Sequence, residues 1–583
     1  MELNILFLCF ATALCVYALI ARVNKPDWDL QKALANNKVF AVSAVTLFAV
    51  AVLVRTWDFG AIPSGMNQDG AMAAVDALAL ANHGTDRFGT PLPVYFEAWG
   101  YGQMSVLLSY LMVPFIKLFG LNAVTARLPM LLASLAGLWV LFRFIERGFG
   151  RAAALLTLAV TAVNPWHIMQ SRWALDCNLL PHFVLFSLYF LHRGLEKPFF
   201  LYLSMLFFGF TMYTYGIAFF TIPILLILLC VWLLVKKRIK PLQALACAAI
   251  YLAVAWPIFS VVIINTFKLK TWATGLITMQ YFPDSIRTND LIIYSKDILN
   301  QLFDNIRSAA EMAILQKGDF SWNFIKGYGQ TYQFTLPFAL LGLWALFAGK
   351  LQGRDGDPKS APDSAARWIM ISWLIIAVVT GIMINGVNTN RINIIFYPMC
   401  ILTALGLRHL LCDAAPVKRV AIATALVYLI SFTGFTTAYF GDHAKAMARD
   451  FCSGMPEAVR YADKIESNVV FITCWSRDES AYTCSEIYTL FGASVDAAYF
   501  KGTADAYGSN GKKLLPYRER YQYVDFDNFQ FDQPAGTAYV YNLLESDCFD
   551  SAGFETKSFG DFGVAVKLAD SAEPAIEEEE PVG

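Results

Sequence analysis

A series of long apolar runs constrains the fold of this chain more than any other feature of its sequence. A membrane-crossing helix needs about 20 mostly apolar residues, and twelve stretches of the 583-residue sequence approach that length. Hydrophobic residues make up 57% and charged residues 16% of the chain, which excludes a disordered protein, a disulfide-stapled miniprotein and an ordinary cytosolic enzyme. The runs are 4–21, 39–57, 126–145, 150–166, 178–192, 198–214, 217–235, 241–263, 333–349, 367–384, 393–411 and 418–438. We therefore predict a mainly α fold, a polytopic transmembrane bundle of about twelve spans.

The first run, 4–21, has the length of a secretory signal peptide. No basic residue precedes it, however, and no small-residue cleavage site is followed by a polar mature sequence. We therefore interpret 1–38 as an extra N-terminal transmembrane anchor followed by a cytoplasmic loop.

The distribution of Lys and Arg between the runs predicts their orientation, because cytoplasmic loops carry an excess of these residues. One alternating set of loops holds 20 Lys and Arg in roughly 70 positions, and the other holds 13 in roughly 170. The first set is 22–38, 143–151, 193–197, 236–240, 350–367 and 408–419, and the second is 55–127, 164–178, 214–218, 263–332 and 385–392. We expect the first set to be cytoplasmic, which places both termini outside.

Segment 103–119 tests this orientation, because it is nearly long enough to be a thirteenth span. It is short, is interrupted by Pro114 and carries Lys117. Counting it as a span would move Arg143 and the KKRIK run at 236–240 to the outside. We therefore favour an amphipathic or re-entrant helix at the outer face, with a thirteenth span as the alternative.

A change from apolar to polar composition marks the boundary between the membrane domain and the C-terminal residues. We expect 39–440 to form the membrane domain and 441–570, which is too polar for lipid, to form a small extracytoplasmic α/β domain. In the latter, 467–474 and 536–543 are typical of strands and 478–491 is typical of a helix. Residues 571–583, with the EEEE run at 577–580, are expected to be a disordered acidic tail.

Eleven cysteines are present. Seven lie in or near the apolar runs and are interpreted as small apolar side chains; these are Cys9, Cys15, Cys177, Cys230, Cys247, Cys400 and Cys412. The other four, Cys452, Cys474, Cys484 and Cys548, fall in the outer domain and could form two disulfides in an oxidising compartment. Cys474 with Cys484 is the preferred pair, and four free thiols are the alternative.

The apolar runs themselves are almost free of ionisable side chains. Ion-coupled transporters place such groups inside the bilayer, where they carry the coupling ion. Here the ionisable residues gather in the loops of the second set, and we find no inverted repeat. This distribution favours chemistry at the membrane surface over transport.

Two loops of the second set combine acidic and basic residues. The first, 63–89, has Asp69 at the start of a stretch with helical spacing that includes Asp76. The second, 164–181, supplies His167, Arg172 and Asp176. Taken singly, these residues have ordinary explanations, namely a helix cap for Asp69 and interfacial anchoring for Arg172 and His167. Two acid-bearing loops on the same face together favour a functional site. No basic arm or aromatic-basic motif indicates nucleic-acid binding.

The sequence resembles the integral-membrane glycosyltransferases of the GT-C fold, and in particular the bacterial branch of the protein O-mannosyltransferase family, glycosyltransferase family 39. The resemblance rests on NQDGAMAAVDA (67–77), GTDRFGTPLPVYF (84–96), LFGLNAVTARLP (118–129), NPWHIMQSRWALDCN (164–178) and, more weakly, NTNRINIIFYP (388–398). It covers about 39–400. The resemblance also implies that 103–119 is a juxtamembrane helix.

The resemblance implies a sugar transfer, with inversion, from a polyprenyl-phosphate donor to a protein, lipid or polymer acceptor at the outer face. It implies Asp69 and Asp176 as catalytic residues, with Asp69 as the general base. Arg172 and Arg391 are the candidate donor-phosphate contacts. Asn67, Gln68, His167 and Asn178 are candidate substrate contacts.

Two further points stay open at the level of sequence. Asp69 and Asp176 could together hold Mg²⁺ or Mn²⁺, although two carboxylates alone specify no metal. Gly70 stands where the family has an acidic residue after the Asp, which leaves a catalytically degenerate binding module as an alternative. A transporter or flippase for a lipid-linked glycan is the third hypothesis.

Overall fold

The computed structural model describes residues 2–20, 28, 30–98, 102–283, 290–349, 351, 363–415, 417–465, 467–474, 481–550 and 553–569. The chain divides into two compact units. The membrane unit combines Met1–Ser64 with Pro91–Met447, and the C-terminal unit combines Gly65–Thr90 with Ala448–Gly583. Segment 65–90, which the sequence analysis places in the membrane domain, is therefore part of the same unit as the C-terminal residues. The acidic tail 571–583 lies outside the described residues.

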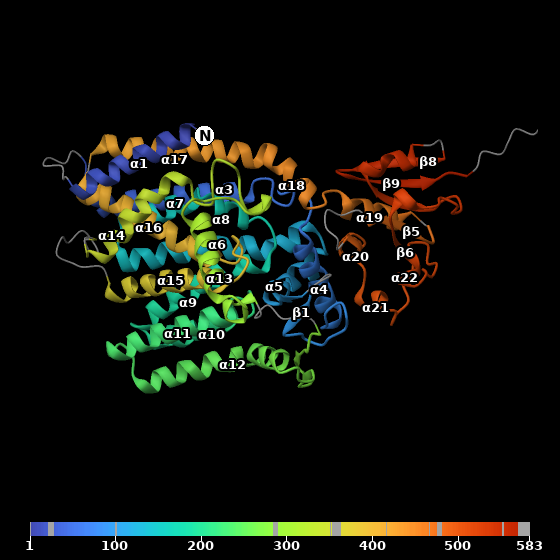
Figure 1. Ribbon diagram of the computed structural model, residues 1–583, viewed down its shortest axis with the longest axis horizontal. Coiled ribbons are helices and arrows are strands. Elements are labelled where there is room, and N and C mark those ends of the chain that lie inside the picture. Colours follow the sequence, from blue (N-terminus) through green and yellow to red (C-terminus); the bar gives the residue numbers. More distant parts are fainter. Residues whose placement is uncertain are drawn as a thin grey trace, which may run out of the picture. The chain divides into compact units, whose positions relative to one another are not determined.

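The membrane unit is a bundle of helices (Figure 1). Its longer helices are α1 (Glu2–Ile20), α3 (Asn37–Thr56), α5 (Leu107–Phe119), α6 (Ala123–Phe149), α7 (Arg151–Ala162), α9 (Asp176–Gly194), α10 (Pro198–Thr211), α11 (Ala218–Val235), α12 (Pro241–Thr266), α13 (Ile298–Ala313), α14 (Leu336–Phe347), α15 (Ser364–Met383), α16 (Phe396–Arg408) and α17 (Lys418–Ala438). The short helices α2 (Leu30–Ala35) and α8 (Pro165–Gln170) lie between them in the sequence. Each of the twelve predicted runs contains one of these helices.

Eight helical stretches of the described chain are long and apolar enough to cross a membrane. They begin at Leu3, Asn37, Ala123, Ala218, Pro241, Ser364, Asn393 and Lys418. Four shorter apolar helices, α5, α7, α10 and the stretch containing α14, accompany them. Large hydrophobic side chains such as Val42, Leu245 and Leu429 are exposed on the outer surface of the bundle, as expected of a surface in contact with lipid. The predicted polytopic helical fold is confirmed.

Small residues let two helices of the bundle approach closely. A Cβ atom added at Gly342 in α14 would lie 1.9 Å from the carbonyl oxygen of Leu402 in α16. One added at Gly406 in α16 would lie 1.9 Å from the carbonyl oxygen of Phe338 in α14. Packing through small residues is a common means of association in lipid, where burial of apolar surface drives helices together only weakly.

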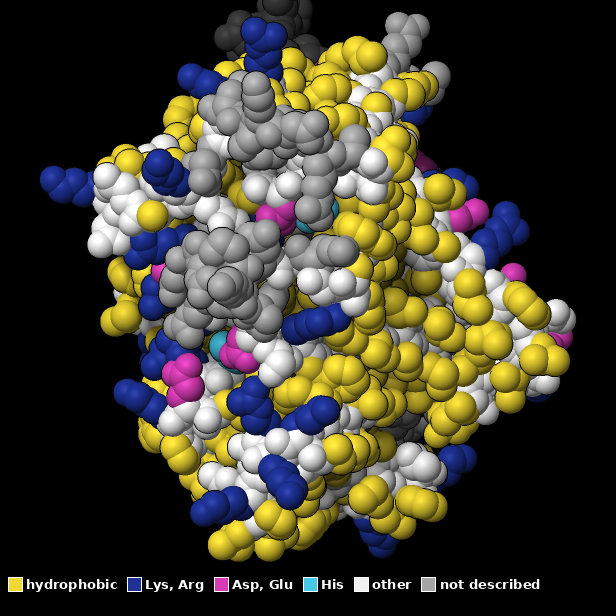
Figure 2. Space-filling view, turned by 90° about the vertical axis from the view of Figure 1, so that its left-hand side faces the viewer, with side chains coloured by type: hydrophobic (Ala, Val, Ile, Leu, Met, Phe, Trp, Pro, Cys, Tyr) yellow, Lys and Arg dark blue, Asp and Glu magenta, His cyan; other side chains and the backbone are white. Residues whose placement is uncertain are grey.

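Described residues of five of the loops predicted to be cytoplasmic contact one another at one end of the bundle. Arg151 contacts Asn37, Arg147 pairs with Glu196, and the Arg238 guanidinium donates to the Ser364 hydroxyl. Figure 2 shows a face on which Lys and Arg side chains are more prominent than Asp and Glu, beside a broad hydrophobic surface. These contacts join loops far apart in the sequence and agree with the alternation predicted from charge.

The loops of the second set also contact one another. The peptide N–H of Trp166 donates to the Gln330 carbonyl oxygen, and the Asn323 side chain donates to Asn390. Segment 103–119, the predicted juxtamembrane helix, forms the short strand β2 (Gln103–Ser105) followed by α5. Strand β2 pairs antiparallel with β1 (Tyr95–Glu97). A second two-stranded pair, β3 (Trp272–Ala273) with β4 (Thr278–Met279), belongs to the same unit.

The C-terminal unit is a small α/β structure with a five-stranded mixed sheet of order β6-β5-β7-β9-β8. Its strands are β5 (Val470–Thr473), β6 (Tyr521–Val524), β7 (Ala538–Asn542), β8 (Phe554–Phe559) and β9 (Phe562–Lys567). Strand β5 is parallel to β6 and β7, whereas β9 is antiparallel to β7 and β8. Its helices are α4 (Gln68–His83), α18 (Ala444–Asp450, which begins in the membrane unit), α19 (Met455–Lys464), α20 (Ala481–Gly492), α21 (Ala497–Phe500) and α22 (Tyr517–Arg520). The two predicted strands and the predicted helix are present as β5, β7 and α20.

The preferred disulfide is not formed. Cys474 follows strand β5 and Cys484 lies in the first turns of α20, and neither is disulfide-bonded. All eleven cysteines, each within the described ranges, are reduced in the structure. The C-terminal unit is instead held by an aromatic core that includes Phe471, Phe526 and Tyr539.

Candidate functional site

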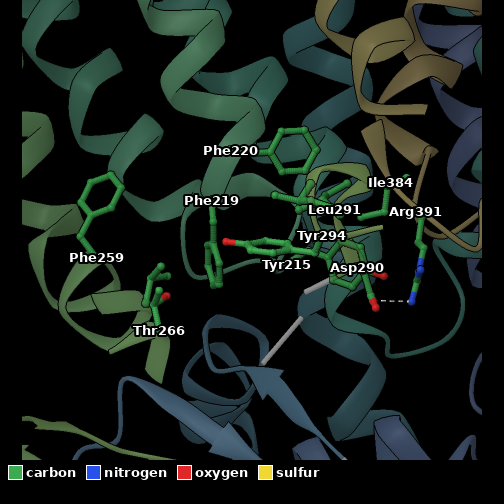
Figure 3. A pocket seen from close by; sticks show the side chains of 13 residues that line it. Tyr215, Phe219, Phe220, Phe259, Thr266, Asp290, Leu291, Tyr294, Ile384 and Arg391 are labelled. Atoms are coloured by element: carbon green, nitrogen blue, oxygen red, sulfur yellow. Dashed lines mark hydrogen bonds and ion pairs between the residues drawn. The ribbon is translucent and has the colours of Figure 1, made fainter. Parts of the chain in front are cut away.

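The membrane unit contains a pocket of about 260 Å³ whose lining changes from apolar to polar. It is lined by Tyr215, Gly216, Ile217, Phe219, Phe220, Phe259, Val262, Thr266, Asp290, Leu291, Tyr294, Ile384 and Arg391. In Figure 3 the rings of Tyr215, Phe219 and Phe220 lie between Phe259 at one end and the paired Asp290 and Arg391 at the other. We call this the amphipathic pocket, because it can hold a ligand that has one charged end and one apolar end.

Arg391 provides the positive charge of the amphipathic pocket. Its Nη2 atom lies 2.8 Å from the Asp290 carboxylate, and its Nη1 atom donates to the Asn385 carbonyl oxygen. The peptide N–H of Arg391 donates to the side-chain oxygen of Asn388 at 2.9 Å, which holds the turn that carries it. The arginine side chain keeps 23% of its surface exposed, so it is accessible to a ligand.

A second, largely apolar cavity neighbours the amphipathic pocket. It measures about 370 Å³ and is lined by residues of α9, α10, α11 and α12. Its lining is Leu191, Leu201, Met205, Pro223, Leu226, Ile227, Leu229, Cys230, Leu233, Ile239, Ala244, Cys247, Ala248, Tyr251, Leu252 and Phe259. Phe259 lines both cavities. We call this second cavity the apolar groove, and it extends along α11 and α12 away from Arg391.

Asp176 occupies the first turn of α9, where the positive end of the helix dipole favours a carboxylate. One of its carboxylate oxygens accepts the peptide N–H of Cys177 at 2.7 Å. The other accepts the peptide N–H of Ser105 at 3.3 Å, which ties α9 to strand β2. The residue is 4% exposed, so its position is fixed by buried contacts.

Two series of contacts link the surroundings of Asp176 to residues of the amphipathic pocket. The Asn393 side chain donates to the Cys177 carbonyl oxygen at 2.6 Å, and Asn393 is two residues from Arg391. On the other side, Ser105 lies opposite Tyr95 in the β1–β2 pair, and the Tyr95 ring lies 5.7 Å from the ring of Phe219. The structure therefore brings Asp176, Asn178 and Arg391 into one region of the membrane unit.

His167 lies in a buried hydrogen-bond chain. Its Nδ1 atom is 3.2 Å from Nε of Arg55, and its Nε2 atom is 2.9 Å from the Tyr397 hydroxyl. The same hydroxyl lies 2.8 Å from Nδ1 of His182. Because these contacts occupy both ring nitrogens of His167, the geometry favours a role in holding α3, α8, α9 and α16 together over the predicted substrate contact.

Arg172 caps the end of α3. Its Nη1 atom donates to the carbonyl oxygens of Val54 and Arg55, and its Nη2 atom donates to those of Trp57, Asp58 and Ile62. Carbonyl oxygens at a helix end lack partners within the helix and require donors from elsewhere. This arrangement favours a structural role for Arg172 over the predicted phosphate contact.

Asn67, Gln68 and Asp69 belong to the C-terminal unit, at the start of α4. The side chain of Asn67 accepts the peptide N–H of Asp69 at 3.0 Å, so Asn67 is the N-cap and Asp69 lies in the first turn. Gln68 and Asp69 are half-buried. The Tyr488 hydroxyl of α20 donates to the Met66 carbonyl oxygen at 2.7 Å, which fixes the chain just before the helix.

A buried ion pair stabilises the other end of this segment. Nη1 of Arg87 lies 2.6 Å from the Asp76 carboxylate, and Asp76 is fully buried. Burial raises the pKa of Asp76 to about 6, although the Arg87 charge acts in the opposite direction. Because the pair is enclosed, Asp76 supports the loop after α4 and is not a candidate for chemistry.

The metal hypothesis has limited support from the side chains. Among the described residues, no group of three or more His, Cys, Asp or Glu side chains could hold a metal ion. Each carboxylate oxygen of Asp176 already accepts a peptide N–H.

Several residues of the amphipathic pocket were not identified from the sequence. Phe219 and Phe220 belong to the apolar run 217–235, and Tyr215 lies in the short loop before it. Only the structure separates these pocket-lining rings from lipid-facing ones. Asp290 lies in the long segment 264–332 with no motif around it. The one sequence feature that points to Asp290 is that its loop, like that of Arg391, belongs to the set predicted to be extracytoplasmic.

Comparisons with known proteins agree with this architecture. A family model described as dolichyl-phosphate-mannose-protein mannosyltransferase matches residues 104–260. The crystal structure of ArnT from Cupriavidus metallidurans bound to undecaprenyl phosphate matches with a TM-score of 0.50 at 14% identity, covering 93% of this chain and 100% of that one. A comparison with curated proteins gives no match.

Two further solved structures are more distant. The Archaeoglobus fulgidus oligosaccharyltransferase tethered to an acceptor peptide has a TM-score of 0.46 at 11% identity, covering 78% of this chain and 64% of that one. The arabinofuranosyltransferase AftD from Mycobacteria has a TM-score of 0.41 at 12% identity, covering 94% of this chain and 41% of that one.

The fold is that of the GT-C membrane glycosyltransferases, as the likeness to ArnT over nearly the whole chain shows. The resemblance inferred from the sequence motifs is confirmed at this level, and the family-model match over 104–260 agrees with it.

Proposed function

We propose that this protein is a membrane glycosyltransferase that transfers a sugar from a polyprenyl-phosphate-linked donor to an acceptor at the outer membrane face. The observation that carries the proposal is the pair of neighbouring cavities on a GT-C fold. The amphipathic pocket presents Arg391, and the apolar groove shares the lining residue Phe259 with it. A lipid phosphate has the same sequence of parts, a charged headgroup followed by a long hydrocarbon chain.

Each of the two cavities would bind a different part of such a donor. The Arg391 guanidinium would contact the donor phosphate, since guanidinium and phosphate form charge-assisted hydrogen bonds. The Asp290 carboxylate, 2.8 Å from Nη2, holds the guanidinium in place. The prenyl chain would lie in the apolar groove, where each buried CH₂ group contributes about 0.8 kcal/mol as an upper scale. The ArnT structure with undecaprenyl phosphate supports a donor of this class.

The reaction is a single in-line displacement with inversion. An acceptor hydroxyl oxygen forms a bond to the anomeric carbon while the bond from that carbon to the phosphate oxygen breaks. The hydroxyl proton passes to a general base, for which Asp69 is our candidate, and the negative charge leaves on the polyprenyl phosphate. A well-placed base contributes about 10²–10⁴-fold to the rate. Asp176, in its buried position at the start of α9, would orient the substrate.

The distribution of Lys and Arg among the loops supports the proposed outer face. The loops rich in Lys and Arg contact one another at one end of the bundle. Asp176, Asn178 and Arg391 lie in loops of the opposite set. With the Lys- and Arg-rich loops cytoplasmic, the amphipathic pocket opens toward the extracytoplasmic side. The acceptor would be a protein, a lipid or a cell-envelope polymer.

The test is turnover of a radiolabelled polyprenyl-phosphate sugar by the full-length protein in native membranes. We expect release of polyprenyl phosphate by the wild type and its loss, by 10²-fold or more, in Asp69→Asn. Asp304→Asn, an exposed carboxylate on α13, is the matched control and should keep full activity.

Each alternative predicts a different result. A catalytically degenerate binding module, suggested by Gly70, would give no turnover in any variant. A flippase would move the lipid across vesicles without releasing the phosphate. Full activity of Asp69→Asn would remove Asp69 as the base and leave the rest of the proposal standing.

A further inference from the structure

We propose that the C-terminal unit carries a binding site for a small, water-soluble phosphate ester such as a phosphorylated sugar. The site is a pocket of about 190 Å³, lined by the end of α19, the residues just before β5, the segment 507–515 and the last residue of α22. We call it the basic pocket. All of its described lining belongs to the C-terminal unit, so the site does not depend on the proposed sugar transfer in the membrane unit.

The lining of the basic pocket carries an excess of positive charge. Lys464, Lys512, Lys513 and Arg520 line it, and Asp463 is the one acidic side chain among the described lining residues. A partly enclosed site strengthens the attraction between such charges and an anion, relative to bulk water. A phosphate ester carries up to two negative charges and three acceptor oxygens, whereas a carboxylate carries one charge. The charge of the lining therefore favours a phosphate.

Arg520 provides a fixed positive charge in the buried part of the pocket. The residue is 2% exposed, and its Nη1 and Nη2 atoms donate to the Ser467 carbonyl oxygen and to Oδ1 of Asp463, both at 3.0 Å. The Tyr521 hydroxyl donates to the same Asp463 oxygen at 2.6 Å, so two donors already engage the one acidic group. Nε of Arg520 has no hydrogen-bond partner among the described residues. A buried donor without an acceptor is unfavourable, which a bound anion or water would relieve.

Two lysines of the basic pocket are available to a ligand. Lys464 and Lys512 are exposed, and neither forms an ion pair with another described residue. The Lys512 ammonium donates to the side-chain oxygen of Asn468 at 3.2 Å, which directs it toward the residues before β5 and leaves two of its three N–H donors. Lys513 contributes less, because its ammonium lies 2.8 Å from the Asp505 carboxylate.

A tight turn positions Lys512. The peptide N–H of Gly511 donates to the Gly508 carbonyl oxygen at 3.0 Å, and that of Gly508 donates to the Lys512 carbonyl oxygen at 2.9 Å. The side-chain oxygen of Asn510 accepts the peptide N–H of Lys512 at 2.8 Å. Because these hydrogen bonds fix the turn before any ligand arrives, binding need not order the segment that carries the lysine.

Tyr507 favours a ligand that carries more than a phosphate group. Its side chain lines the basic pocket although the residue is 64% exposed. The neighbouring Ser509 and Asn510 add a hydroxyl and an amide, which can form hydrogen bonds with sugar hydroxyls. An aromatic ring with an apolar face beside such polar groups suits a sugar ring, which also has an apolar face and a polar edge. A prenyl chain fits less well, since the basic pocket is about half the volume of the apolar groove and mostly polar in its lining.

Calorimetric titration of the full-length protein in phosphatidylcholine nanodiscs tests the site. The ligands are glucose 6-phosphate, inorganic phosphate, glucuronate and glucose, at constant ionic strength. We expect glucose 6-phosphate to bind most tightly, and Lys464→Gln and Lys512→Gln each to weaken it about two- to fivefold. Lys501→Gln removes an exposed lysine of the same unit that does not line the pocket, and should leave binding unchanged.

Tyr507→Ala separates the two parts of the ligand. We expect it to weaken glucose 6-phosphate about two- to tenfold and to leave inorganic phosphate unchanged. Equal binding of these two ligands, with no effect of Tyr507→Ala, would overturn the ester assignment in favour of free phosphate. Tighter binding of glucuronate would overturn the phosphate assignment. Equal losses in Lys501→Gln and Lys512→Gln, or no saturable binding to the wild type, would overturn the basic pocket as a site.

Discussion

Arg391 is the residue on which donor binding depends most in this account. It is the one Arg or Lys among the described residues that line the amphipathic pocket, and Asp290 holds its guanidinium. Arginine and lysine differ here, because only the guanidinium can contact a carboxylate and a phosphate in one plane.

Substitution of Arg391 tests this role. We expect Arg391→Ala to raise the KM for a polyprenyl-phosphate donor at least tenfold, because a charge-assisted hydrogen bond contributes about 1.5–3 kcal/mol. Arg391→Lys should give an intermediate value. The measurement is the initial rate of phosphate release against donor concentration. An unchanged KM in Arg391→Ala would show that the phosphate binds elsewhere.

Individual residues also show how far the sequence predicts the candidate site. Asp176 and Arg391 are predicted from separate loops, and the structure joins Cys177, next to Asp176, to Asn393, two residues from the pocket-lining Arg391. Their roles remain predictions. Arg172 and His167 are predicted site residues because of their residue type and motif. The sequence does not reveal that Arg172 donates to five carbonyl oxygens. It also does not reveal that Arg55 and Tyr397 hold both ring nitrogens of His167. A sequence shows which groups can do chemistry, but buried partners decide which are available.

At the scale of elements, the end of α3 depends on a side chain from a distant loop. Arg172 donates to carbonyl oxygens at and beyond the last turn of that helix. Because the side chain is buried, these oxygens have no ready replacement from water.

We expect Arg172→Gln to destabilise the membrane unit by about 1–3 kcal/mol while the folded fraction keeps the wild-type KM for the donor. Thermal unfolding in detergent, followed by intrinsic fluorescence, measures the first quantity, and the transfer assay measures the second. A raised KM with unchanged stability would instead restore Arg172 as a phosphate contact.

Helices α11 and α12 form two walls of the apolar groove, so a large side chain added between them would block the groove. We expect Ala248→Trp, which fills the groove, to raise the donor KM about tenfold or more by excluding the prenyl chain. Ile263→Trp adds the same ring to an exposed position of α12 outside both cavities and is the matched control. Assays with donors of shortened prenyl chain check the cause, since a chain too short to reach Ala248 should be insensitive to the substitution. Equal effects of the two variants would contradict the assignment.

The elements themselves were largely predictable, because apolar length determines a membrane helix. Each of the twelve apolar runs contains a helix, and β5, β7 and α20 are where the alternation of residues indicated. Strands β6, β8 and β9 were not predicted. The exposed residues of β8 and the short, aromatic β6 lack a regular alternation, so their pairing depends on neighbours distant in the sequence.

At the scale of the whole molecule, the account depends on which side of the membrane each loop occupies. The contacts among the Lys- and Arg-rich loops place them at one end of the bundle, and the proposed orientation, based on their charge bias, takes that end to be cytoplasmic. The association of segment 65–90 with the C-terminal unit was not predictable, because no change of composition marks that segment.

Epitope tags test the orientation. One tag is inserted in the α11–α12 connection at 238 and another after Ser509 in the C-terminal unit. In intact spheroplasts, antibody should detect only the second, and permeabilisation should expose the first. Retained sugar transfer controls for folding. Detection of the first tag on intact cells would invert the topology and move the amphipathic pocket to the cytoplasmic side.

The most direct test of the central claim is an experimental structure of the full-length protein in nanodiscs with a bound polyprenyl-phosphate sugar. The account predicts density for the phosphate within hydrogen-bond distance of Arg391, with the prenyl chain passing Phe259 into the apolar groove. Density for the lipid elsewhere on the bundle, with both cavities unoccupied, would contradict it.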